Sequence, residues 1–313
     1  MSEPGWSAAG RGKLRPDSGF GHHWVMMGAA PVGALGAALG AYALWERRWY
    51  RLSDHEVPLR AGLPALDVLH LSDTHLKGSD RGLISFLRSL PERLGTVPDL
   101  VLATGDLIEE NSGIEPLIEC LAAIDARWGR FYVLGSHDYY QAEFKSYLKY
   151  FTGQRGSPLG APPAATQELE AGLRAKGWVG LANRTVPVET NAGIVRVTGV
   201  DDPYIHRHRT DHIGRAEDAL AIGLMHAPDL VSDYALNGFD LMLAGHTHAG
   251  QVRFPVAGAL VTNCSLPAAL AGGLHQVGGA WLHVSPGLGT GKFQPIRFNC
   301  RPEATLLRLR PER

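Results

Sequence analysis

Five apolar runs of this chain each end in a short cluster of polar residues. The runs have the length and composition of buried strands, and they read LDVLHLS, DLVLATG, RFYVLGS, LAIGLMH and DLMLAGH. Segments with helical spacing of apolar residues separate them, and this alternation predicts an α/β fold built around a sheet. Because ligands of such folds bind beyond the carboxyl ends of the strands, the polar clusters should meet at one mouth of the protein.

The periodicity also gives the expected elements by residue range. Apolar residues at helical spacing predict helices at 80–94, near 113–127 and at 228–236. Short apolar runs bounded by turn residues predict strands at 66–72, 99–104, 130–135, 184–189, 193–199, 219–226, 239–245, 250–254, 280–284 and 304–309. The second half is therefore expected to be richer in strands than the first.

Composition narrows the class of protein. With 313 residues the chain can bury a full core, and its formal charge of −1 gives no basic field for nucleic acid. Three cysteines cannot build a disulfide framework. A Cys264–Cys300 bridge and unpaired buried thiols both stay open, so cysteine usage does not fix the compartment.

The N-terminal part differs from the rest. Residues 1–23 are rich in Gly, Ser and Arg and are expected to form a flexible tail, whereas residues 24–45 carry no charge and are flanked by Trp and Tyr. This length suits a transmembrane or membrane-anchoring helix at 24–46, and it predicts a membrane-associated protein. A Gly/Ala-rich helix packed on the domain and an uncleaved export signal are the alternatives. Arginines on both sides leave the orientation open, and residues 47–65 are expected to be a linker or first edge strand.

The residue types in the clusters are those that bind metal ions. Asp73 and His75 are two residues apart, so in extended backbone their side chains point to one face, and His246 and His248 repeat this spacing. Asp106 stands alone at its strand end and suits a carboxylate bridge between two cations. Imidazole and carboxylate groups together are donors for Mn, Fe or Zn, and so many of them predict two divalent metal ions.

The order of the clusters resembles the signature of the calcineurin-like metallophosphoesterases. Asp73-Thr74-His75, Gly105-Asp106, Gly135-Ser136-His137-Asp138, His226 and Gly245-His246-Thr247-His248 follow that pattern. The resemblance runs from about residue 66 to the C-terminus, and the tail resembles the bacterial membrane-linked or exported branch. It implies a four-layer α/β/β/α sandwich over residues 66–313, with the metals at one end of the paired sheets.

The resemblance also implies roles for individual residues. Asp73, His75, Asp106 and His248 would hold the first metal, and Asp106, His226 and His246 the second. The family has Asn before the catalytic His, and this chain has Ser136, whose hydroxyl is a weaker ligand. His137 would assist the leaving group or stabilise the phosphoryl oxygens, and Asp138 would orient it through its other ring nitrogen.

Two further polar segments lie outside the signature. The segment Gly287–Lys292 lacks the spacing of a phosphate-binding loop and is expected to be a tight turn near the metal mouth. Arg207 and Arg209 follow a predicted strand, and they either contact a substrate phosphate or belong to a solvated loop.

The family resemblance implies a metal-dependent phosphoesterase. Resemblance to the membrane-linked branch suggests phosphodiester or pyrophosphate substrates attached to lipid or envelope components. A phosphomonoesterase acting on soluble substrates and a non-catalytic metal-binding scaffold are the alternatives. No protein partner is predicted. No nucleic-acid partner is predicted either, because the charge is near zero and the sequence lacks the basic, aromatic-interleaved pattern of a nucleic-acid groove.

Overall fold

The structure is a computed structural model that describes residues 21–142, 160–214, 219–255, 258–259 and 262–312. Most of the predicted N-terminal tail therefore lies outside the described residues. The chain divides into two compact units, Met1–Tyr42 and Ala43–Arg313. Helix α1 (Gly21–Glu46) covers the segment predicted as a membrane helix. No helix in the described ranges combines the length and apolar character that crossing a membrane requires.

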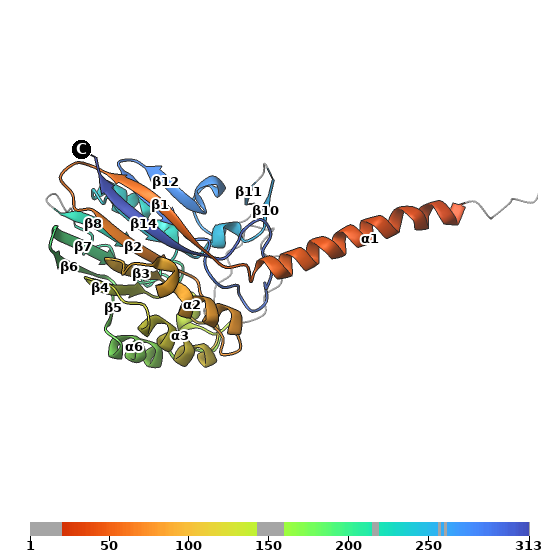
Figure 1. The fold of residues 1–313 in the computed structure, drawn as a ribbon, viewed down its shortest axis with the longest axis horizontal. Helices are drawn as coiled ribbons and strands as arrows, with labels where there is room; N and C mark the ends of the chain where they lie inside the picture. Colours follow the sequence, from red (N-terminus) through yellow and green to blue (C-terminus); the bar gives the residue numbers. More distant parts are fainter. Residues whose placement is uncertain (1–20, 143–159, 215–218, 256–257, 260–261, 313) are drawn as a thin grey trace, which may run out of the picture. The chain divides into compact units, whose positions relative to one another are not determined.

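The second unit contains two six-stranded sheets (Figure 1). The first has the order β1-β14-β2-β3-β4-β5, in which β2 to β5 are parallel neighbours and β14 is antiparallel to β2. Its strands are β1 (Arg51–Leu59), β2 (Leu66–Leu71), β3 (Leu100–Thr104), β4 (Gly129–Val133), β5 (Trp178–Gly180) and β14 (Glu303–Pro311).

The second sheet has the order β12-β13-β9-β8-β7-β6, and β7, β8, β9 and β13 run parallel in it. Its strands are β6 (Arg184–Thr190), β7 (Gly193–Gly199), β8 (Leu220–Leu224), β9 (Leu241–Ala244), β12 (Gly273–Val277) and β13 (Ala280–Val284). The short strands β10 (Arg253–Phe254) and β11 (Gly258–Ala259) form a separate hairpin.

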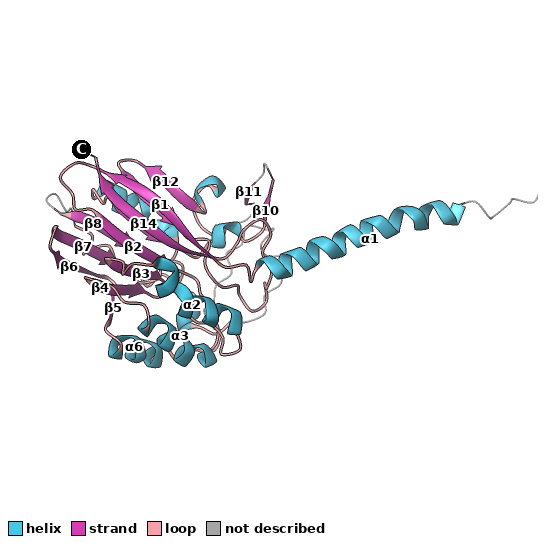
Figure 2. Ribbon diagram, viewed as in Figure 1, coloured by secondary structure: helices cyan, strands magenta, loops and turns pink. Residues whose placement is uncertain are grey.

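Three apolar cores hold these layers together. One core lies between the sheets and takes residues such as Leu102 and Phe131 from the first sheet and Ile222 from the second. Another lies between the first sheet and the helices, and a third between the second sheet and its own helix, around Tyr234. The helices on the first sheet are α2 (Arg81–Leu94), α3 (Ile114–Ala122) and α6 (Thr166–Ala175), and Figure 2 shows them beside β3 to β5. The helix on the second sheet is α7 (Val231–Leu236).

The remaining elements are short and lie in the connections. They are α4 (Ser136–Tyr139), η1 (Asn111–Gly113), η2 (Pro228–Leu230), η3 (His248–Gly250) and η4 (Ala268–Leu270).

The predicted α/β class is confirmed, and the predicted strands and helices lie within a few residues of the observed ones, although the helix expected near 113–127 ends at Ala122. Of the two expectations for the segment before residue 66, linker or first edge strand, the structure has the edge strand at residues 51–59: they form β1 at the edge of the first sheet and pair along their full length with β14. Sequence reasoning also missed α6, β5 and β12. No disulfide joins the three cysteines, all of which lie in the described ranges; Cys120 and Cys300 are buried and Cys264 is half-buried.

Candidate metal centre

The candidate ligands leave the carboxyl ends of parallel strands. Asp73 and His75 follow β2, Asp106 follows β3, and Ser136 to Asp138 follow β4. His226 follows β8 in the other sheet, and His246 and His248 follow the neighbouring strand β9. Both sheets contribute candidate ligands from the carboxyl ends of their strands. Residues that are up to 175 positions apart in the sequence therefore come together.

The backbone at these strand ends is in an unusual conformation. Of the eleven described non-glycine residues with positive φ, five are candidate ligands: Asp73, His75, Asp106, His246 and His248. Such left-handed conformations are unfavourable for residues with a side chain, and they concentrate at functional sites, where the surroundings enforce them. The backbone strain therefore lies at residues that were predicted to be metal ligands.

Two glycines leave room for the converging side chains. A Cβ atom on Gly135 would lie 2.3 Å from Asp106 Oδ1 and 2.7 Å from His226 Nε2. A Cβ atom on Gly245 would lie 2.2 Å from Asp73 Oδ2. Glycine is therefore required at both positions for the carboxylates to reach the site.

One group of ligand atoms comes from Asp73, His75 and His248. The Nε2 atoms of His75 and His248 lie 3.1 Å apart, and His248 Nε2 lies 3.6 Å from Asp73 Oδ1. One ligand atom from each of the three residues lies within 4.8 Å of the others. Burial, followed by the neighbouring His75 and Arg297, holds the pKa of His248 well below its ordinary value. His248 therefore favours the neutral form that binds metals.

A second group comes from Asp73, Asp106 and His226. His226 is fully buried, and its Nδ1 atom donates to the carbonyl oxygen of Thr104 at 2.8 Å. This bond leaves Nε2 facing Asp106 Oδ2 at 3.3 Å, and Nε2 has no hydrogen-bond partner among the described residues. A buried ring nitrogen without a partner, aimed at a buried carboxylate, fits a divalent cation between them.

Asp106 contacts both groups. Its Oδ2 atom lies 3.5 Å from His75 Nε2 and 3.3 Å from His226 Nε2, and its Oδ1 atom accepts the backbone N–H of His137. Burial raises the pKa of Asp106, but His226 and His137 outweigh it and hold the pKa well below its ordinary value. Asp106 therefore has the position and the charge expected of a bridge.

His246 and Ser136 adjoin these groups. The His246 backbone N–H donates to both carboxylate oxygens of Asp73 at 3.0 and 3.1 Å, and its ring centroid lies 5.2 Å from that of His226. Burial lowers the pKa of His246 to about 4. Ser136 is buried at the first position of α4, directly before His137. The structure thus brings the predicted ligands to one end of the two sheets.

Sequence reasoning missed Glu109, which lies between two histidines of the site. Its Oε2 atom lies 2.6 Å from His75 Nδ1 and 3.2 Å from His137 Nδ1. Its other oxygen accepts the backbone N–H of Lys292. Burial lowers the pKa of His137, but Asp106 and Glu109 outweigh it and raise that pKa to about 9. Glu109 therefore orients both rings and, together with Asp106, favours the protonated form of His137.

Asp138 does not have the predicted contact with the His137 ring. Its carboxylate instead accepts the backbone N–H groups of Leu107, Ile108 and Gly135, at 2.8, 3.1 and 3.0 Å. The first turn of α4 directs the Asp138 side chain back toward the loop after β3, and Glu109 takes the place beside His137. Asp138 fixes two ligand-bearing loops to each other.

Arg207 and Arg209 pair with carboxylates that are not candidate ligands. Arg207 pairs with Asp201 at 3.0 Å, and its guanidinium lies 4.2 Å from the ring centre of Tyr139. Arg209 is exposed and lies 3.4 Å from Asp211. Both arginines lie in the loop after β7, and their contact with a substrate phosphate stays a prediction.

The segment Gly287–Lys292 forms the predicted turn beside the site. The N–H of Leu288 contacts the carbonyls of Ser72 and Asp73, and Gly289 donates to Asp73. Buried Arg297 holds this turn from behind, because it donates to the carbonyls of residues 287 and 289 and lies 3.2 Å from His248 Nδ1.

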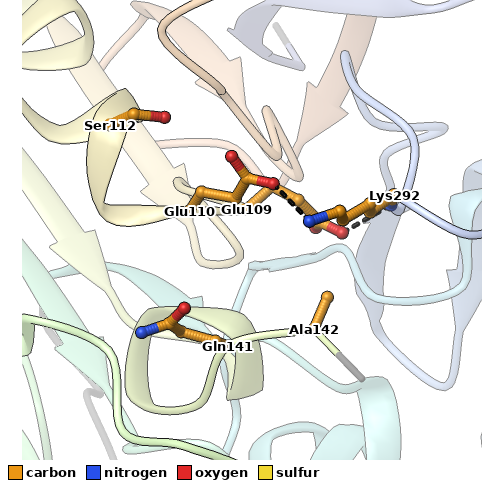
Figure 3. Close-up of a pocket in the computed structure, with 6 residues that line it drawn as sticks. All are labelled: Glu109, Glu110, Ser112, Gln141, Ala142 and Lys292. Atoms are coloured by element: carbon orange, nitrogen blue, oxygen red, sulfur yellow. Dashed lines mark hydrogen bonds and ion pairs between the residues drawn. The ribbon is translucent and has the colours of Figure 1, made fainter. Parts of the chain in front are cut away.

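A cavity of about 280 Å³ adjoins the site through Glu109. Figure 3 shows Lys292 between the carboxylates of Glu109 and Glu110, with Gln141 on the opposite wall. The Lys292 ammonium pairs with Glu110 at 2.7 Å. The other residues that line the cavity are Ser112 and Ala142.

Comparison with known proteins places this geometry in a family. The calcineurin-like phosphoesterase domain matches residues 66–250, and the chain belongs to that family. The uncharacterized metallophosphoesterases YkoQ and YkuE of Bacillus subtilis are 29% and 27% identical, covering 78% and 91% of this chain and 84% and 95% of theirs. Phosphodiesterase YaeI of Escherichia coli is 24% identical, covering 88% and 94%. The protein is therefore a metal-dependent hydrolase of phosphate esters.

Proposed function

We propose that the protein hydrolyses phosphodiester or pyrophosphate bonds with two divalent ions, Mn, Fe or Zn, at this site. Asp73, His75, Asp106 and His248 would hold one ion, and Asp106, His226, His246 and Ser136 the other. When bound, such ions lower the pKa of a water molecule and offset the charge of the phosphoryl oxygens. The convergence of both ligand groups on Asp106 supports this assignment.

His137 is the residue that we assign to proton transfer. Its Nδ1 atom is buried beside Glu109, whereas its side chain is 30% exposed, so the Nε2 edge is the part that a substrate can reach. Asp106 and Glu109 raise the pKa of His137 to about 9 before metal binds, and Glu109, which is not a proposed ligand, continues to favour a ring with a proton on Nε2 when metal is bound. His137 can donate that proton to the leaving oxygen or to a phosphoryl oxygen.

The charges around the site favour a phosphodiester over a phosphomonoester, and this observation carries the substrate class. A monoester is a dianion near neutral pH and usually needs an additional cation. Besides His137, three cationic side chains among the described residues are already engaged: Lys292 is paired with Glu110, Arg207 with Asp201, and Arg297 is buried against carbonyl groups. A diester carries one negative charge fewer and needs no such cation. The name of phosphodiesterase YaeI agrees with this choice.

Hydrolysis of bis-p-nitrophenyl phosphate against p-nitrophenyl phosphate, with Mn²⁺ added, tests the proposal. We expect the diester to be the better substrate, and His137→Ala to reduce its turnover by about 10²–10⁴-fold. Preference for the monoester would support a phosphomonoesterase instead. Mn²⁺ binding without turnover of either compound would support a non-catalytic scaffold.

We also propose that α1 anchors the protein at a membrane, as in the membrane-linked branch of the family, with lipid- or envelope-linked substrates. The charge-free segment 24–45 supports this proposal. Leu35 and Leu39 are 62% and 46% exposed on α1, so replacing both with Arg should release the full-length protein from the membrane fraction. Val97→Arg, at an exposed apolar residue elsewhere, is the control. An equal membrane fraction for all three proteins would contradict the anchor.

A further inference from the structure

A row of buried polar side chains leads from the second sheet to Asp73. It starts at His283 on β13, passes through His70 on β2 and Thr104 at the end of β3, and reaches Ser72. All four side chains and Asp73 have no exposed surface. The row crosses the apolar core between the sheets, where polar groups are retained only when they are hydrogen-bonded.

The contacts along the row are short. His283 Nδ1 lies 2.8 Å from His70 Nδ1, and His70 Nε2 lies 2.8 Å from Thr104 Oγ1. Thr104 Oγ1 lies 2.7 Å from Ser72 Oγ, and Ser72 Oγ lies 2.5 Å from Asp73 Oδ2. These distances are those of good hydrogen bonds at every step.

The carboxylate at the end of the row fixes the direction of every bond. An ionised carboxylate only accepts, so the single hydroxyl proton of Ser72 goes to Asp73. Thr104 must then donate to Ser72, and His70 must donate from Nε2 to Thr104. A neutral imidazole carries one proton, so Nδ1 of His70 accepts, and His283 donates from its own Nδ1. His283 Nε2 then carries no proton and is an acceptor, and it has no partner among the described residues.

We propose that His283, His70, Thr104 and Ser72 are positioning residues that hold the Asp73 carboxylate in its metal-binding orientation. This inference rests on the proposed metal site. With Oδ2 held by Ser72, Oδ1 faces the His75–His248 side, where it lies 3.6 Å from His248 Nε2. Burial lowers the pKa of both His70 and His283, and neutral rings are what the one-way row requires.

Thr104 also connects this row to the second ligand group. Its hydroxyl is part of the row, and its carbonyl accepts the Nδ1–H of His226. Outer groups of this kind orient metal ligands, and their loss costs about 10- to 100-fold in metal affinity. Since His283 comes from the second sheet, packing of the two sheets sets the orientation of a ligand on the first.

Histidine tautomers test the row without metal. Long-range ¹H–¹⁵N correlation spectra of the ¹⁵N-histidine-labelled protein in EDTA at pH 7.5 should show His70 with its proton on Nε2 and His283 with its proton on Nδ1. The opposite tautomer at either ring, or a doubly protonated ring, would overturn the inference.

Mn²⁺ titration calorimetry then tests positioning. We expect Thr104→Val to weaken binding of one Mn²⁺ by about 10- to 100-fold and Thr104→Ser to restore it. Thr198→Val is the matched control, because Thr198 is an equally buried threonine whose hydroxyl bonds Thr185 away from the row. If Thr104→Val does not fold, Ser72→Ala removes the last donor and carries the same expectation.

The outcomes separate the two proposals. Mn²⁺ affinity in Thr104→Val or Ser72→Ala equal to that of the unaltered protein would overturn the positioning role alone. An unaltered protein that binds no Mn²⁺ would overturn the proposed metal site, and the positioning role with it.

Discussion

Glu109 places one carboxylate oxygen 2.6 Å from His75 Nδ1, and the same oxygen lies 3.2 Å from His137 Nδ1. A candidate metal ligand and the candidate acid therefore share one buried anion. Carboxylates that hold the outer nitrogen of a ligating histidine fix its tautomer and its ring orientation. Glu109 joins the two functions of the site, metal binding and proton transfer.

Replacing Glu109 with Gln should reduce both functions while leaving the fold intact. The amide keeps the size of the side chain but removes a charge that, after that of Asp106, raises the pKa of His137. We expect Mn²⁺-dependent diester hydrolysis to fall about 10- to 100-fold, with weaker Mn²⁺ binding by calorimetry. Glu119→Gln, at an exposed ion pair with Arg88, is the control and should stay near the unaltered rate. Unchanged hydrolysis in Glu109→Gln would remove Glu109 from the site.

Asp138 should behave differently from Glu109, because its contacts are with backbone. In Asp138→Asn, one carboxylate oxygen is replaced by an NH₂ group, which cannot accept a hydrogen bond. At least one of the three hydrogen bonds from backbone N–H groups is therefore lost. We expect the free energy of unfolding to fall by about 1–3 kcal/mol in urea denaturation without metal. A loss of activity with unchanged stability would instead favour the role of orienting the His137 ring.

The positions of the ligands could be predicted from the sequence because each follows an apolar run, and strand ends of a sheet meet at one edge. Glu109 could not be found in this way. It lies in the loop after Asp106, and its contact with His75 depends on how two loops fold over each other. Its position three residues after Asp106 was the available signal, since a side chain there can still reach the site.

The errors in the fold have a similar cause. The sequence does not decide between linker and edge strand for residues 51–59, because their partner, β14, begins 252 residues later, and no local pattern reveals that pairing. The expected contact of Asp138 with His137 depended on the direction of a short helix that periodicity does not specify. Local patterns gave the strands, and long-range packing determined which side chains touch.

Gly135 should be sensitive to the smallest substitution. In Gly135→Ala the added methyl group would collide with Asp106 Oδ1 and His226 Nε2, which belong to the proposed ligand set. We expect Gly135→Ala to lose most of its Mn²⁺ binding and hydrolysis. Gly279→Ala is the control and should keep both, because its Cβ atom meets nothing within 4 Å. Comparable Mn²⁺ affinities in the two variants would show that the ligands do not occupy these positions.

Stability should fall below pH 6.5 in part through His283. Burial lowers the pKa of His283 from 6.5 to about 4, so the unfolded chain binds a proton there that the folded protein does not. The contribution of His283 to the free energy of unfolding is therefore fully present above pH 6.5 and is lost as the pH falls toward 4. At pH 5 the free energy of unfolding should be lower by about 2 kcal/mol through this residue. Urea denaturation in EDTA at pH 7.5 and 5.0 should show a smaller loss in His283→Asn. An equal loss in both proteins would contradict a neutral buried ring.

Ser136 is where the chain departs from its family, and substitution there should change metal binding. An amide oxygen reaches further and is a better ligand than a hydroxyl, so Ser136→Asn should strengthen binding of the weaker Mn²⁺ and lower the Mn²⁺ concentration needed for half-maximal hydrolysis. Ser136→Ala should raise that concentration if the hydroxyl is a ligand, because the alanine side chain has no donor atom for a metal. Equal Mn²⁺ dependence in Ser136→Ala and Ser136→Asn would show that residue 136 does not contact the metal, and that water completes the second site.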